Sequence, residues 1–341
     1  MILIIYILFI LTAFIVVKLI CNSKSTISLF DFNVQYTLPL RGLLAILIII
    51  HHYALVEWNI EIPVIQEFMT WGGVVVSVFF FMTGYGLMIS YKYKGDKYLS
   101  GFIQHRLGKI LPPLVIATFC YLAFISVLNH SNSFPLVFEL LNGTTPLPTS
   151  WFAYAIIFFY IIFFLSAKAL SKIKHIILSL WIIATIYIIV LNMLNWENCW
   201  YKSTYALNIG FTYAYYEDRI KNFIQKRPQF FAGCVLLTIL VLIGMRFVLG
   251  DAHISMWKSL VYYLTPLFVV AITYLCGAIS SSVLKFLGGI SYEIYIVQGA
   301  FITLLSPLRD HWALYFILVV VFSISFAWML QKLCNIGNRL S

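Results

Sequence analysis

Charged side chains are scarce in this sequence of 341 residues. Asp, Glu, Lys and Arg together make up 10% of it, whereas hydrophobic residues make up 62% and the mean hydropathy is +0.95. Soluble globular domains carry roughly 25% charged residues. The composition therefore excludes an ordinary soluble domain. It predicts an all-α polytopic integral membrane protein, because a chain that crosses a bilayer as helices satisfies its own backbone hydrogen bonds.

The sequence also lacks the patterns of a metal site, a disulfide framework and a separate soluble domain. Its six cysteines are scattered without CxxC or other metal-type spacing. The longest stretches between apolar runs, 92–110 and 130–150, have the length of functional loops. We therefore expect one transmembrane domain over residues 1–341, with no metal ion and no permanently bound cofactor.

Apolar runs of about 20 residues, the length that spans a bilayer as a helix, recur along the whole chain. The first, 2–20, has no basic segment before it and no cleavage site after it, so we interpret it as a retained span. The seventh, 203–217, is the least apolar, and without it every later span would invert. The eleven predicted spans cover 2–20, 38–56, 72–91, 111–129, 151–168, 175–194, 203–217, 229–249, 259–279, 289–307 and 312–332.

The net charge of +10 is distributed in short clusters between these runs. Such a distribution does not resemble a nucleic-acid-binding face. The loops that contain Lys97, Lys172 and Arg219 are basic, whereas the alternate loops contain acidic residues such as Glu61 and Asp251. By the positive-inside rule the basic loops are cytosolic. We expect a multi-pass protein of the cell membrane with its N-terminus outside and its C-terminus in the cytosol.

The second predicted span carries Arg41 and His52 in an otherwise apolar run. Eleven residues at about 100° each bring them within roughly 20° of the same helix face, about 16 Å apart along the axis. His51 is turned by about 80° from Arg41 on the same reckoning. Polar residues at this depth are functional candidates by default. The alternative is that Arg41 reaches the membrane surface and both histidines are satisfied in the interior.

Two further features suggest a site. Arg106 and Lys109 precede Pro112 and Pro113, which could open a helix whose first amides are unpaired. A cytosolic polyanion could bind there, although these cations could instead anchor the helix to anionic lipid headgroups. Glu293 is the one carboxylate that we place inside a predicted span, and it is a second functional candidate.

Four segments, in order, resemble the acyltransferase 3 family of membrane O-acyltransferases. Leu40–Ala45 followed by His52 is similar to the family's R-x10-H signature. The other three, 73–85, 106–113 and 287–296, are similar to its GVxxFFxxSGF, RxxRIxPP and LGxxSYxIYL motifs. Together the segments cover most of residues 38–307.

The sequence departs from the family pattern at three positions. Thr83 stands where the family usually has Ser, Lys109 where it often has a second Arg, and Gln298 where a His often closes the late helix. The family usually has ten spans, so the helix at 2–20 is an extra one before a core of about 38–332. No SGNH-type hydrolase domain follows the core, and we expect a stand-alone acyltransferase.

The resemblance implies transfer of an acetyl group from cytosolic acetyl-CoA to a hydroxyl of a cell-surface or secreted polysaccharide or its lipid-linked precursor. The expected partners are this acyl-CoA, the glycan acceptor and membrane lipids, and the oligomeric state stays open. His52, as general base, and Arg41 are the catalytic candidates, and Arg106 and Lys109 are expected to bind the CoA phosphates. The possible supporting residues are His51, Glu293, Tyr292 and Thr83.

Two other classes of function compete with this interpretation. In a transporter or permease, Arg41, His52 and Glu293 would line a substrate or proton path. A scaffold of a polysaccharide export complex would tolerate loss of the Arg41 and His52 side chains. Release of CoA that depends on a glycan acceptor would distinguish the acyltransferase from both.

Overall fold

The computed structural model describes residues 32–56, 63–129, 143–249, 254–276 and 281–340, and within these ranges the chain is helical and contains no strand. Eight of the described helices are long and apolar enough to cross a membrane. The prediction of an all-α, multi-pass membrane protein is therefore confirmed. The predicted first span, 2–20, lies outside the described residues.

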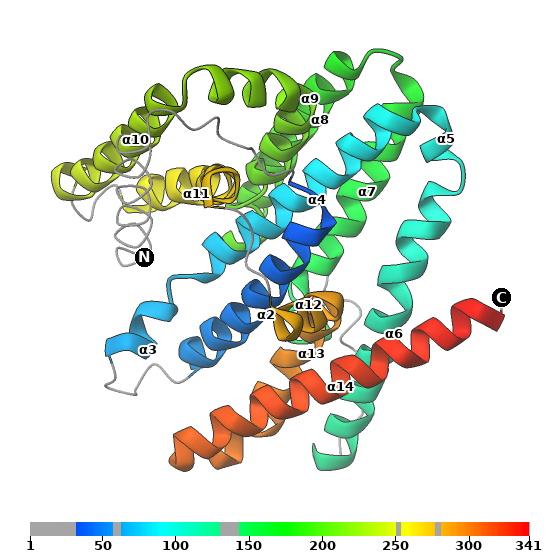
Figure 1. Ribbon diagram of the computed structural model, residues 1–341. Coiled ribbons are helices and arrows are strands. Elements are labelled where there is room, and N and C mark those ends of the chain that lie inside the picture. Colours follow the sequence, from blue (N-terminus) through cyan, green and yellow to red (C-terminus); the bar gives the residue numbers. More distant parts are fainter. Residues whose placement is uncertain (1–31, 57–62, 130–142, 250–253, 277–280, 341) are drawn as a thin grey trace.

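The helices of this part form one bundle with tilted axes (Figure 1). Their bounds are α2 Val34–Val56, α3 Pro63–Phe68, α4 Gly72–Lys94, α5 Asp96–Leu99, α6 Phe102–Asn129, α7 Trp151–Ala169, α8 Ile173–Met193, η2 Asn198–Trp200, α9 Tyr205–Lys226, α10 Pro228–Leu249, α11 Ile254–Cys276, α12 Ser282–Gly289, α13 Ser291–Leu304, η3 Ser306–His311 and α14 Trp312–Leu340.

The prediction for α6 was wrong at its start. The helix does not open at the proline pair but begins at Phe102 and continues through Pro112 and Pro113. Proline has no N–H, so each removes one i→i−4 bond and leaves the carbonyl four residues earlier without its helical partner. These carbonyls belong to Gly108 and Lys109. A long helix in a membrane protein tolerates such a defect where other groups can satisfy the carbonyls.

The predicted late span, 289–307, corresponds to α13, but the structure places a further helix, α12, directly before it. Helices α12 and α13 meet at Ile290 with an angle of 75° between them. Helix α12 packs against α2 (Figure 1) with the two backbones in contact. A Cβ atom on Gly288 would lie 1.9 Å from the Leu38 carbonyl oxygen, and one on Gly42 would lie 2.1 Å from that of Leu284. Only glycine at both positions permits this approach.

Helix α9 contains the weakly apolar seventh predicted span and runs beside α4 in the same direction. Ser203, just before α9, donates a hydrogen bond of 3.1 Å to the Gly73 carbonyl at one end of α4, and Lys92 pairs with Asp218 at 2.7 Å near the other end. Because α9 accompanies α4 along its length, we count α9 among the spans. Asn208 and Glu217 of α9 are buried against protein, so the composition of this helix need not be apolar.

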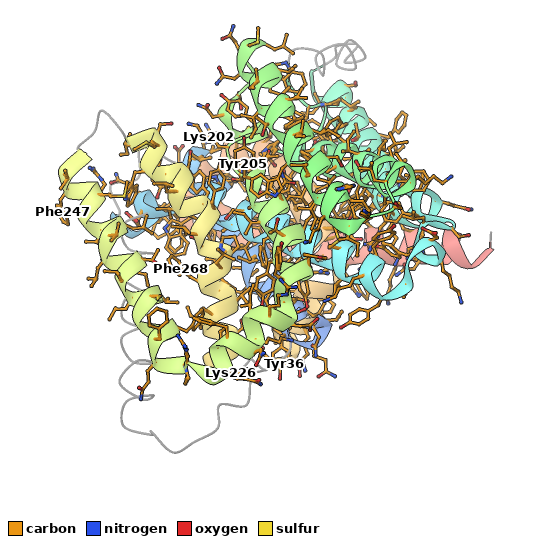
Figure 2. All side chains as sticks on the ribbon, turned by 90° about the horizontal axis from the view of Figure 1, so that it is seen from above. Tyr36, Lys202, Tyr205, Lys226, Phe247 and Phe268 are labelled. Carbon is orange, nitrogen blue, oxygen red and sulfur yellow. The ribbon has the colours of Figure 1, made fainter. Side chains whose placement is uncertain are left out.

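Helices α10 and α11 form a pair at one side of the bundle (Figure 2). Phe247 lies on the outer side of α10 and is 74% exposed, whereas Phe268 of α11 is buried. Large exposed apolar side chains of this kind are the ordinary surface of a helix that faces lipid, since lipid chains are as apolar as the side chains themselves.

The contact between α2 and α12 predicts the effect of one added methyl group. Gly288→Ala should lower the free energy of unfolding by about 1–3 kcal/mol, because the backbones must separate. Gly244→Ala on the exposed face of α10 is the matched control, since a Cβ there meets no atom within 4 Å. Thermal unfolding in detergent should show loss of stability in the first variant alone. Equal stability of the two would contradict the close contact.

The orientation in the membrane stays a prediction, which exposed positions can test. Lys97 on α5 lies at the end of the bundle where α7 continues into α8, and Asn195 follows the far end of α8 (Figure 1). The positive-inside rule places Lys97 in the cytosol. With single cysteines in a cysteine-free protein, an impermeant maleimide should label Asn195→Cys in intact cells and Lys97→Cys only in opened membranes. The reverse pattern would invert the topology.

Candidate functional site

A cavity of about 500 Å³ lies among α2, α4, α6, α7, α12, α13 and α14. Its lining includes six of the eight candidate site residues, and only His51 and His52 are not part of it. Lys109 is exposed, so the cavity reaches the protein surface at its end. The six are Arg41, Thr83, Arg106, Lys109, Tyr292 and Glu293.

Aromatic rings hold Arg106 at this end of the cavity. Its guanidinium carbon lies 5.5 Å from the ring centroid of Tyr160, 5.8 Å from that of Tyr98 and 5.9 Å from that of Phe102, and the guanidinium also donates a hydrogen bond to the Tyr98 hydroxyl. Arg41 of α2 interacts electrostatically with both Tyr160 and Arg106. Cation–π contacts of this kind contribute about 0.5–2 kcal/mol each and fix the orientation of the guanidinium. Two arginines are thus brought to one place.

Among the residues that the structure describes, no carboxylate pairs with this group of cations. Within the described ranges Arg41, Arg106 and Lys109 form no ion pair, and the buried Nε of Arg106 has no hydrogen-bond partner. Glu293 lines the same cavity and is 8% exposed, but it does not pair with them. Arg41 and Arg106 are half-buried, and leaving charge unpaired there costs more than it does in open water. The arrangement suits a ligand with several negative charges, which arginine binds through charge-assisted hydrogen bonds.

The proline pair of α6 adds hydrogen-bond acceptors next to the cations. Gly108 and Lys109, whose carbonyls lose their helical partners, both line the cavity. The Tyr292 hydroxyl donates a bond of 2.9 Å to the carbonyl of Ile110. This bond fixes the start of α13 against the same turn of α6. A ligand in this part of the cavity therefore meets cationic donors and backbone acceptors together.

The other end of the cavity is apolar and aromatic. Val76 and Phe79 of α4, Phe152 of α7 and Tyr295 of α13 line it. The ring centroids of Phe79 and Phe152 are 6.2 Å apart, and those of Phe152 and Tyr295 are 5.4 Å apart. The Tyr295 hydroxyl accepts a hydrogen bond of 3.1 Å from the Phe152 backbone and donates one to the Thr149 carbonyl. Phe79, Phe152 and Tyr295 together form what we call the aromatic layer.

His52 follows behind the aromatic layer and does not line the cavity. Its Nδ1 lies 2.8 Å from Nε2 of Gln298, and the same Nε2 lies 2.8 Å from Oγ1 of Thr149. Gln298 comes three residues after Tyr295 on α13, so both sides of the layer are held by one helix. His52 is 9% exposed. The cations line the cavity, whereas His52 lies outside its lining and is linked to the aromatic layer through Gln298 and Thr149, since Thr149 also accepts the Tyr295 hydroxyl bond.

His51 has different surroundings. Its Nδ1 lies 3.0 Å from the carbonyl oxygen of Phe68, at the end of α3. A Cβ on Gly72 would lie 2.1 Å from its Nε2, so the glycine makes room for the ring. This contact joins α2 to the connection between α3 and α4. His51 therefore has a packing role in the structure, away from Gln298 and Thr149.

Several residues of the site carry no signal in the sequence. Tyr98 belongs to the separate helix α5, and Tyr160 is one of many aromatic residues in its span. Thr149 follows Pro148 in a connecting segment. Gln298 was visible only as a departure from the family pattern. The Thr83 hydroxyl, by contrast, donates to the Phe79 carbonyl at 2.9 Å within its own helix.

Metal binding has no support in the described part of the chain, where no three His, Cys, Asp or Glu side chains are grouped to hold an ion. A family model described as an acyltransferase domain matches residues 40–332. The chain therefore belongs to the acyltransferase 3 family and is a membrane acyltransferase. Neither the curated proteins nor the solved structures gave a match.

Proposed function

We propose that the protein transfers an acetyl group from cytosolic acetyl-CoA to a hydroxyl of a cell-surface or secreted polysaccharide, or of its lipid-linked precursor. The observation that supports this most is that Arg41, Arg106 and Lys109 line one cavity and form no ion pair among the described residues. The positive-inside rule assigns these cations to the cytosolic side, where the donor would enter.

The donor would lie along the cavity with its phosphates at the cations. The guanidinium groups of Arg41 and Arg106 and the ammonium of Lys109 would bind the phosphate oxygens, and Gly108 and Lys109 would offer carbonyls to the amides of the pantetheine arm. The arm would carry the thioester toward Phe152 and Tyr295. This order follows from the polar and apolar ends of the cavity.

The acceptor hydroxyl would meet the thioester at the aromatic layer. Its oxygen forms a bond to the acyl carbon, the bond between that carbon and the CoA sulfur breaks, and His52 takes the hydroxyl proton and returns it to the CoA thiolate. An imidazole suits this role because it can gain and lose a proton near neutral pH. Gln298 holds the ring at Nδ1, and Thr149 in turn holds Gln298. For Nε2 of His52 to accept the hydroxyl proton, Nδ1 must carry the ring's own hydrogen, so the Gln298 side-chain oxygen, which is otherwise without a partner among the described residues, would face Nδ1. The acceptor would reach His52 from the outer side of the membrane.

The transporter hypothesis is less favoured. Its path would have to connect Arg41 with His52, but only Arg41 lines the cavity. The family assignment also supports acyl transfer. A transporter would need an opening that connects the cavity with His52.

The donor site can be tested through Arg106. Arg106→Ala should weaken binding of acetyl-CoA by about 1.5–3 kcal/mol, roughly 10- to 150-fold, because it removes charge-assisted bonds to phosphate. Lys168→Ala is the control, since Lys168 packs on Phe164 at the end of α7 and does not line the cavity. Isothermal titration of the purified proteins gives both affinities. Unchanged binding in Arg106→Ala would return this residue to a lipid-anchoring role.

The two adjacent histidines provide a second test. His52→Ala should lower acyl transfer by about 10²- to 10⁴-fold, the usual cost of losing a positioned general base. His51→Ala removes the bond to the Phe68 carbonyl and the ring contact with His52 at 4.9 Å between centroids, but not the bond between His52 and Gln298, and it should retain most of the activity. Transfer of labelled acetyl is measured for variants of equal abundance that bind acetyl-CoA equally well. Full activity in His52→Ala would exclude it as the base.

A further inference from the structure

We propose that Phe79 and Phe152 restrict the donor to a short acyl group, acetyl or propionyl. This inference rests on the proposed function, because it concerns the acyl-CoA that the cavity would bind. The two residues come from α4 and α7, and their rings lie 6.2 Å apart at the apolar end of the cavity. An acyl chain that extends from a thioester in this cavity must meet them.

The length of the cavity supports this limit. Its lining runs along α4 from Gly86 to Val76, roughly 15 Å at 1.5 Å per residue, and along α7 from Tyr160 to Phe152, roughly 12 Å. The pantetheine arm has about as many chain atoms as four residues and so extends about 14 Å. With the phosphates at Arg106, the sulfur would already lie beside the aromatic layer. Little room remains for an acyl chain.

The narrow point lies at the aromatic layer rather than nearer the cations. Gly86, Gly108 and Gly289 line the part of the cavity toward the cations, and a Cβ on any of them would meet no atom within 4 Å. Glycines leave the backbone open to close approach by a ligand. The pantetheine arm would therefore pass freely, and selection would fall on the group at its end.

Neighbouring groups hold Phe152 and Tyr295 of the aromatic layer in place. The ring of Phe152 contacts Phe80 at 4.8 Å and Tyr295 at 5.4 Å between centroids, and Tyr295 is fixed by its bonds to the Phe152 backbone and to Thr149. Packed rings in a protein interior have few alternative positions. A longer acyl chain could enter only by displacing them.

The experiment compares acetyl-CoA, butyryl-CoA and hexanoyl-CoA as donors for the wild type, Phe79→Ala and Phe152→Ala. The ratio of kcat/KM for hexanoyl-CoA to that for acetyl-CoA should rise at least tenfold in each variant, since each methylene in a pocket changes discrimination by about 10- to 200-fold. Phe158→Ala is the control. Phe158 lies on α7, as Phe152 does, but it does not line the cavity. Its ring centroid lies 5.1 Å from that of Tyr187 on α8.

Phe79→Ala is the sharper of the two variants, because the Phe152 ring also packs against Phe80 and Tyr295, and its loss would loosen those rings as well. Binding of CoA itself to each variant verifies the fold. A wild type that uses hexanoyl-CoA as well as acetyl-CoA, or ratios that stay unchanged in both variants, would overturn the acyl-length proposal. Failure of CoA and of all three thioesters to bind the wild type would instead overturn the proposed function.

Discussion

The backbone contact between α2 and α12 is the constraint on which the site depends. Because Gly42 and Gly288 allow α12 to lie against α2, the chain must turn by 75° before it continues as α13. This turn directs Tyr292, Glu293 and Tyr295 into the cavity and brings Gln298 to His52. A continuous helix over 282–304 could not do both, since α12 and α13 would then share one axis.

A second constraint sets the electrostatics of the cavity. Arg106 packs against aromatic rings rather than against an acidic side chain. A carboxylate beside Arg106 would neutralise it and compete with any anionic ligand. The rings of Tyr98, Phe102 and Tyr160 instead orient the guanidinium and leave its charge available. The unpaired charge is costly in the free protein, and a bound polyanion would relieve that cost. The unpaired cations would thus explain both the affinity of the cavity for a polyanion and the lower stability of the protein without it.

The sequence predicted most of the spans, because apolar runs and loop charge are local properties. It placed α2, α4, α7, α8, α10 and α14 within a few residues at most of their starts and ends, except that α14 extends to Leu340. It failed at α6, where the proline pair lies inside the helix, and at α12 and α13, where contact with α2 decides the break. It named six residues of the cavity, but not the Tyr98 and Tyr160 that hold Arg106. Such partners come from other helices, and periodicity within one segment does not reveal them.

Within the proposed reaction, the position of His52 outside the cavity that the cations line has a chemical consequence. A thioester is prone to hydrolysis, and a general base beside it would activate water as readily as an acceptor hydroxyl. Because His52 does not line the cavity, the base would reach a bound donor only through the acceptor hydroxyl that lies between them. Water that enters from the side of Lys109 reaches the donor but not the imidazole. Transfer would then require an acceptor that arrives on the His52 side, so the arrangement would favour the sugar hydroxyl over water without any group that recognises water itself.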